Sequence, residues 1–255
     1  MVKKLKEHQF LFEELVKRDF KKKYKGTVLG LLWSVLSPLL QLIVMALVFT
    51  RFFGRSTPHY IVYVFCGNII FSYYHEATRG GMGAIVMNAG IFTKVNVPKY
   101  LFLLSKNVQA LISFLLTILI LFVFVAADRI PFTWRFFLLL YPVGMLILFN
   151  IGLGLILSAW YVFFRDMQYL YDVFNRLLMY MSAVFYTIDK FSPQARQLFL
   201  INPVYCFIYY FRLVIINGVI PPLYLHLIIL ADVCIVVGFG CLIYKKKNTE
   251  FLYYV

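Results

Sequence analysis

The chain has 255 residues, of which 62% are hydrophobic and only 14% are charged. Soluble domains are about 45–50% apolar and about 25% charged, so this composition indicates an integral membrane protein and excludes disordered or disulfide-rich secreted chains. The net charge of +14 is attributed to membrane topology and anionic lipid, and no nucleic-acid partner is expected. The four cysteines are scattered without a C-x-x-C pair, which argues against a metal site.

Residues 1–25 differ in character from the rest of the chain. They are rich in Lys and Arg, and Phe12, Val16 and Phe20 recur at a spacing of four. This pattern predicts a cationic amphipathic helix lying at the membrane surface. A signal peptide is not expected, because the basic stretch is too long and the following apolar stretch has spanning length. We therefore expect a cytoplasmic interface helix followed by a single membrane domain over 26–255.

Six apolar segments follow, each near the roughly 20 residues that a transmembrane helix needs. They lie at 28–50, 60–79, 101–127, 134–162, 168–187 and 222–244. The sequence therefore predicts an all-α polytopic membrane protein with six spans. With the N-terminus inside, 17 of the 25 Lys and Arg residues fall in inner segments and 7 in outer ones. Because inner loops carry the excess of these residues, both termini are expected in the cytoplasm.

Two connecting regions are longer than simple turns. The inner loop 80–100 begins with glycines and has room for a short helix at the membrane surface. The outer region 188–221 is apolar but is interrupted by Pro193 and by Asn202-Pro203. It is therefore expected to form one or two short re-entrant helices, which protein or a water-filled cavity must cover.

Polar side chains recur at helical spacing on spans 1, 2 and 5, where each is costly in lipid. The stripes contain Trp33, Ser34, Ser37 and Gln41, then Asn68, Ser72, Tyr73, Glu76 and Arg79, then Tyr169, Asp172, Arg176 and Tyr180. Asp172 and Arg176, four residues apart, are expected to pair. Aromatic, hydroxyl and amide groups suit a carbohydrate better than an ion, so one interpretation is a hydrated sugar route. The alternative is that these side chains only hold helices together. Span 3 has a thinner stripe of Lys106, Gln109, Ser113 and Thr117.

Several catalytic motifs are absent from the sequence. There is no G-x-x-x-x-G-K-[ST] phosphate loop, no H-E-x-x-H and no G-x-S-x-G. We therefore expect no catalytic residue, no metal ligand and no cofactor in this chain.

The stretch 15–49 resembles the first part of ABC-2 type polysaccharide exporter permeases, in which a basic interface helix runs into a span containing G-x-L-W-x-x-x-x-P. These motif positions are Gly30, Leu32, Trp33 and Pro38.

The resemblance continues through 163–189, with its Arg165-Asp166 pair, and 198–212, with Asn202-Pro203. The order and spacing of these motifs extend it over essentially the whole chain. It implies that two permease copies pair and that each docks a separate ATPase subunit carrying ATP and Mg. ATP hydrolysis would then drive a lipid-linked polysaccharide or teichoic-acid-like polymer across the bacterial plasma membrane. Unaided passage of such a polymer through about 30 Å of hydrocarbon is prohibitive, which supports an external energy source.

The resemblance also implies roles for particular positions. Contacts with the ATPase are expected from helix 5–24 and loop 84–98, through Lys17, Arg18, Lys21, Lys22, Lys23, Asn88, Ile91, Phe92 and Lys94. An outer gate is expected over 190–218, with Asn202, Pro203, Tyr205, Tyr209 and Tyr210. A channel belt around the glycan is expected from Trp33, Tyr73, Tyr169, Tyr180 and Phe185. Lys25, Arg79 and Arg176 could attract a diphosphate.

Three other functions remain open from the sequence. An ABC-2 permease for a small hydrophobic drug or lipid would share the fold but have a more apolar route. A membrane enzyme acting on lipid-linked sugars would need an acid or base that is not evident. An ion-coupled transporter could use Asp232 or Glu76.

Overall fold

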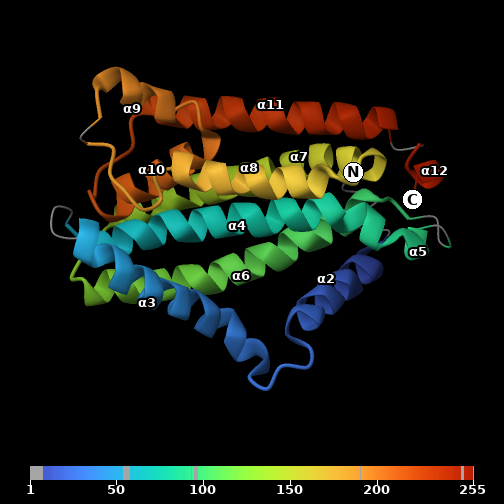
Figure 1. Cartoon of the computed structure of the whole chain (residues 1–255), viewed down its shortest axis with the longest axis horizontal. Coiled ribbons are helices and arrows are strands. Elements are labelled where there is room, and N and C mark those ends of the chain that lie inside the picture. Colours follow the sequence, from blue (N-terminus) through green and yellow to red (C-terminus); the bar gives the residue numbers. More distant parts are fainter. Residues whose placement is uncertain are drawn as a thin grey trace.

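The computed structural model describes residues 8–53, 58–92, 94, 97–189, 191–247 and 250–254. These residues form helices joined by loops, with no strand among them. The all-α prediction is therefore confirmed for these residues. The elements are α2 (Gln9–Tyr24), η1 (Gly30–Leu32), α3 (Trp33–Phe53), α4 (Tyr60–Met87), α5 (Ala89–Phe92), α6 (Tyr100–Ala127), η2 (Trp134–Leu139), α7 (Leu140–Phe163), α8 (Met167–Met181), α9 (Pro193–Phe199), α10 (Pro203–Ile215), α11 (Leu223–Lys247) and α12 (Phe251–Tyr254). Figure 1 shows the long helices side by side, with α2 and α3 diverging from the loop that joins them.

Within the described residues, three segments are long and apolar enough to cross a membrane: α6, η2 with α7, and α11. A fourth is obtained if α9 and α10, bent by 106° at the break between them, count as one span. The chain is therefore a polytopic membrane protein. The six-span topology and its orientation stay predictions. Helix α8, at the place of the fifth predicted span, has 15 residues. At about 1.5 Å per residue it extends only about 22 Å, which is short for a membrane span.

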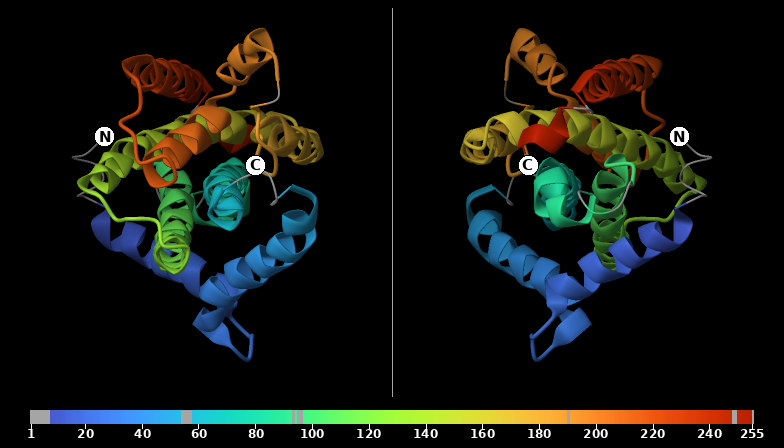
Figure 2. Two further views of the ribbon diagram at one scale, coloured as in Figure 1. Left: turned by 90° about the vertical axis from the view of Figure 1, so that its left-hand side faces the viewer. Right: turned by 90° about the vertical axis from the view of Figure 1, so that its right-hand side faces the viewer.

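The centre of the fold is a row of packed helices in the order α6, α4, α7 and α11. Seen end-on, α4 and α6 lie between the V formed by α2 and α3 and the remaining helices (Figure 2). Glycine permits the closest approach in this row, because a Cβ on Gly240 of α11 would lie 2.5 Å from the carbonyl oxygen of Gly152 on α7. Small residues of this kind let membrane helices pack backbone against backbone.

A second buried cluster attaches the N-terminal helix to the bundle. Leu15 of α2 is 3% exposed and packs with the buried side chains of Ile85, Phe92, Phe102 and Phe251. These residues come from α4, α5, α6 and α12. The first residues of α2 therefore lie at one end of the molecule, together with α5 and α12. Helices α9 and α10 lie near the other end (Figure 1).

Two predicted boundaries are wrong. Helix α4 does not end near residue 79 but continues to Met87, so the glycines read as the start of a loop are helical. Gly81 packs against the Cα of Gly154 on α7, which is why a small residue stands there. Helix α8 ends at Met181 rather than 187, and Ala183 has a left-handed backbone with φ of 48°.

Candidate functional site

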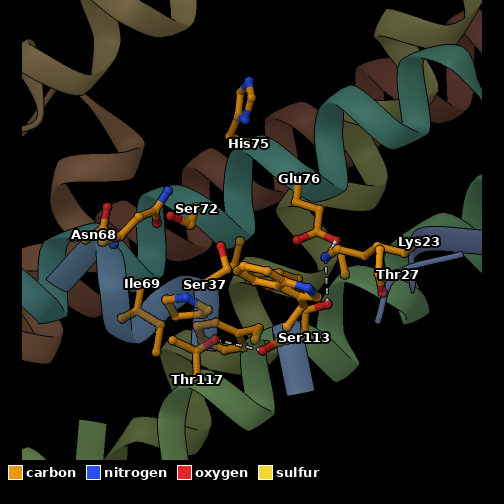
Figure 3. A pocket seen from close by; sticks show the side chains of 16 residues that line it. Lys23, Thr27, Ser37, Asn68, Ile69, Ser72, His75, Glu76, Ser113 and Thr117 are labelled. Atoms are coloured by element: carbon orange, nitrogen blue, oxygen red, sulfur yellow. Dashed lines mark hydrogen bonds and ion pairs between the residues drawn. The ribbon is translucent and has the colours of Figure 1, made fainter. Parts of the chain in front are cut away.

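A polar cavity of about 490 Å³ lies between α3, α4 and α6, with the end of α2 at one side. Its lining combines hydroxyls, amides and aromatic rings, as Figure 3 shows for many of these residues. The lining residues are Lys23, Thr27, Trp33, Ser37, Pro38, Gln41, Asn68, Ile69, Ser72, Tyr73, His75, Glu76, Ala110, Ser113, Phe114 and Thr117. Flat aromatic faces with nearby hydroxyls and amides can bind a sugar ring, because the rings contact C–H surfaces and the polar groups bond its hydroxyls.

An ion pair closes the α2 side of this cavity. The Lys23 Nζ lies 2.6 Å from Glu76 Oε1 and donates to Ser113 Oγ at 3.1 Å. The amide of Gln109 also donates to Glu76 Oε1, at 3.2 Å. Three helices, α2, α4 and α6, therefore meet at one carboxylate.

The middle of α2 is held by a buried carboxylate. The side chain of Asp19 is only 2% exposed, and its Oδ2 lies 3.2 Å from Lys106 Nζ on α6. The Ser105 hydroxyl donates to the same oxygen at 3.3 Å, and Arg18 pairs with Oδ1 at 2.8 Å. Arg18 also donates to Asn88 Oδ1 at 2.8 Å, which joins α2 to the turn after α4.

Two other lysines at this end of the molecule, Lys17 and Lys99, have pKa values shifted by their surroundings. Lys17 is exposed, and its hydrogen bond and ion pair with Glu14 raise its pKa. Lys99, just before α6, is buried between the rings of Phe92 and Phe251 at 5.7 and 5.5 Å. Burial lowers the pKa of Lys99.

At the opposite end, α10 begins at a cap that also ties it to α8. The Asn202 side chain accepts from the backbone N–H of Val204 and Tyr205 and donates to Ser182 Oγ at 2.9 Å. Pro203 occupies the first position of α10, where its missing N–H costs nothing. Two local signals in the sequence, Asn then Pro, thus explain where this helix starts.

Arg212 of α10 is a buried cation, 5% exposed, and it donates hydrogen bonds to oxygen atoms of neutral groups. It donates to the carbonyls of Tyr63, Ala183 and Val184 at 3.3, 3.0 and 2.9 Å. It also donates to the Tyr63 hydroxyl at 2.8 Å and lies 3.4 Å from the centroid of that ring. A Cβ on Gly67 would lie 2.9 Å from its Nη2, so glycine leaves room for the guanidinium.

Comparison with known proteins adds the deciding observation: residues 11–216 match the ABC-2 type transporter family. The chain belongs to that family. The match runs from the first turn of α2 to the end of α10, so the cavity, the anchored part of α2 and the capped α10 all lie inside the matched region.

Relatives of this ABC-2 family member include an O-antigen export system permease protein of Myxococcus xanthus, 32% identical over 80% of this chain and 79% of the relative. A Klebsiella pneumoniae protein of the same description is 26% identical over 95% of both chains. A polysialic acid transport protein of Escherichia coli is 24% identical over 75% of this chain and 76% of the relative.

In this ABC-2 family member the cavity brings together seven of the residues that the sequence analysis placed in the stripes of a substrate route: Trp33, Ser37, Gln41, Asn68, Ser72, Tyr73 and Glu76. Ser34 lies outside the side chains that the structure describes. The cavity is completed by α6 rather than by α8, through Ser113 and Thr117.

Of the remaining predicted route residues, Arg79 is on α4 and the others lie on or beside α8. Tyr169 and Tyr180 are 65% and 60% exposed, Arg176 is also exposed, and Phe185 is buried beyond the end of the helix. The predicted pairing of Asp172 with Arg176 is wrong, because Asp172 pairs with Arg79 of α4. Asp172 therefore pairs with a residue of a neighbouring helix rather than with the residue four positions later in α8.

The predicted ATPase-contact residues fall into two groups. Lys17, Lys21, Lys22 and Lys94 are exposed and Ile91 is half-buried, whereas Asn88 and Phe92 are buried within this chain. At the predicted outer gate, Tyr205 and Tyr210 are buried, and Tyr209 stacks on Tyr205 with ring centroids 5.7 Å apart. Tyr210 also bonds His226 of α11 at 3.0 Å.

Proposed function

We propose that this chain is the permease subunit of an ATP-driven exporter that moves a lipid-linked polysaccharide from the cytoplasm to the outer face of the bacterial inner membrane. The observation that carries the proposal is the family match over α2 to α10, together with relatives named as O-antigen and polysialic acid export proteins. The polar and aromatic lining of the cavity supports a sugar-containing substrate over a purely apolar drug or lipid. The family resemblance extends the substrate class to teichoic-acid-like polymers.

The proposed topology has six spans, with both termini in the cytoplasm and α2 lying at the inner surface. The placement of α2, α5 and α12 at one end of the molecule supports it (Figure 1). Residues 188–221 then form the outer gate, and the bend of 106° between α9 and α10 fits a re-entrant segment. The chain would form a single membrane domain preceded by the interface helix.

The proposed assembly holds two copies of this chain and two copies of a separate ATPase subunit, which bind ATP and Mg. Helix α2 and the 84–98 region would supply the docking surface. Exposed Lys17, Lys21 and Lys22 support this role for α2. Because exposed cations attract an acidic patch on a partner at long range, their contribution is expected to weaken as salt rises.

The first test is affinity purification of the tagged chain from its native membrane. Recovery with a stoichiometric nucleotide-binding subunit that hydrolyses ATP, together with loss of cell-surface glycan on depletion, would support the proposal. Recovery without an ATPase, with surface glycan unchanged, would refute it. The double substitution Lys21→Glu and Lys22→Glu should reduce ATPase recovery severalfold. The double substitution Lys245→Glu and Lys246→Glu at the end of α11 serves as a charge-matched control.

A further inference from the structure

The cavity and the N-terminal helix meet at one small group of side chains. Lys23 is on α2, and it contacts Glu76 of α4 and Ser113 of α6. Gln109 of α6 donates to the same Glu76 carboxylate. Figure 3 shows Lys23, Glu76 and Ser113 together at one end of the cavity, while Asn68 and Thr117 lie toward the other end. We call Lys23, Glu76, Gln109 and Ser113 the latch.

Two of the polar attachments of α2, those of Asp19 and Lys23, differ in burial. Asp19 has a side chain only 2% exposed and bonds both Lys106 and Ser105, so removing it would leave buried groups unpaired. The side chains of Lys23 and Glu76 are 33% and 34% exposed. Water therefore competes for the Lys23 contact but not for the Asp19 contact, one helical turn earlier.

A half-exposed ion pair contributes up to about 1 kcal/mol, which corresponds to about a fivefold change in an equilibrium. A contact of this strength is too weak to hold the fold together on its own. It is strong enough to bias two arrangements of α2 that have similar free energies.

We propose that the Lys23–Glu76 pair is a latch that closes the cavity while α2 rests on α4 and α6. Displacement of α2 by the ATPase subunit, pivoting about Asp19, separates Lys23 from Glu76 and opens that side of the cavity. This inference rests on the proposed function, since it assigns the docking helix a direct role in access to the substrate cavity.

The experiment measures water access to the cavity in the complex with its ATPase subunit. A cysteine is placed at Thr117, in a background with Cys234→Ser and Cys241→Ser; Cys66 and Cys206 remain because they are buried. The rate of labelling by a sulfonated, membrane-impermeant maleimide is compared between the nucleotide-free complex and the complex trapped with a non-hydrolysable ATP analogue. A cysteine at the exposed Gln194 of α9 reports labelling far from the latch.

Lys23→Met should raise labelling at position 117 by up to about fivefold in the nucleotide-free complex and reduce the difference between the two nucleotide states. The reversed pair, Lys23→Glu with Glu76→Lys, should restore the parent rate, and Lys246→Met should leave it unchanged. Labelling at position 194 should stay constant in all variants.

Two results would overturn the latch while leaving the proposed function in place. One is parent-rate labelling in Lys23→Met with the ATPase subunit still bound, and the other is a reversed pair that labels as fast as the single variant. If the parent chain purifies without any ATPase subunit, the proposed function and the latch both fall.

Discussion

Arg212 provides the sharpest test of how the end of the fold that contains α10 is held together. Its guanidinium donates to three backbone carbonyls, of Tyr63, Ala183 and Val184. The last two follow the end of α8, where helical carbonyls have lost their partners within the helix. Arg212→Met keeps most of the side-chain volume but removes every donor.

A buried acceptor left without its donor costs about 1–3 kcal/mol, and Arg212→Met leaves three such carbonyls, so the expected loss is at least about 3 kcal/mol. For a chain of this size, each kcal/mol shifts the melting temperature by about 2–4 °C. Arg212→Met should therefore lower the melting temperature by at least about 6 °C in detergent micelles, as measured by intrinsic fluorescence. Arg212→Lys should fall between the parent and this variant, because an ammonium group cannot reach carbonyls with the planar fork of a guanidinium.

The control is Arg196→Met on the exposed helix α9, where substitutions away from buried features change stability by at most about 0.5 kcal/mol. If Arg212→Met melts within about 2 °C of the parent, the three carbonyls find other partners at little cost. The role assigned to Arg212 in holding the end of α8 would then be wrong.

Two further substitutions test particular contacts. Gly240→Ala should destabilise the protein by about 1–3 kcal/mol through overpacking, because its Cβ would meet the Gly152 carbonyl oxygen at 2.5 Å. The control is Gly238→Ala, whose Cβ would meet nothing within 4 Å; it should be neutral or slightly stabilising in the same melting assay. Asn202→Ala should cost about 1 kcal/mol by removing the cap of α10, and Asn202→Asp should retain most of the cap; an unchanged melting temperature for Asn202→Ala would contradict the capping role.

Much of the helix pattern could be predicted because apolar runs of spanning length dominate the sequence. The end of α8 could not, since residues 182–187 contain no Gly or Pro to mark a break. Just beyond the end of the helix, Arg212 of α10 binds the carbonyls of Ala183 and Val184, a tertiary contact that the local sequence does not reveal. The glycines near 80 were misread because Gly can mark either a loop or a close helix contact, and only the position of Gly154 decides between them.

The candidate site was predictable in part for a similar reason. Helical spacing reveals which side chains of one helix share a face, and it correctly groups Ser37 with Gln41 and Ser72 with Glu76. It does not reveal which helices face each other. The stripe on α6 that contains Ser113 and Thr117 was visible in the sequence, but its place opposite α3 and α4 follows from packing.

The division of α2 into a buried and an exposed side has a practical consequence for engineering. Leu15 and Asp19 face the bundle, while Glu14, Lys17 and Lys21 face outward. If α2 docks the ATPase subunit as proposed, partner preference can be changed at the outward positions alone, since these side chains do not pack against the bundle. A hybrid that takes only the outward residues of a relative should then fold as the parent does and bind that relative's partner, whereas a graft of the whole helix would also disturb its contacts with α6.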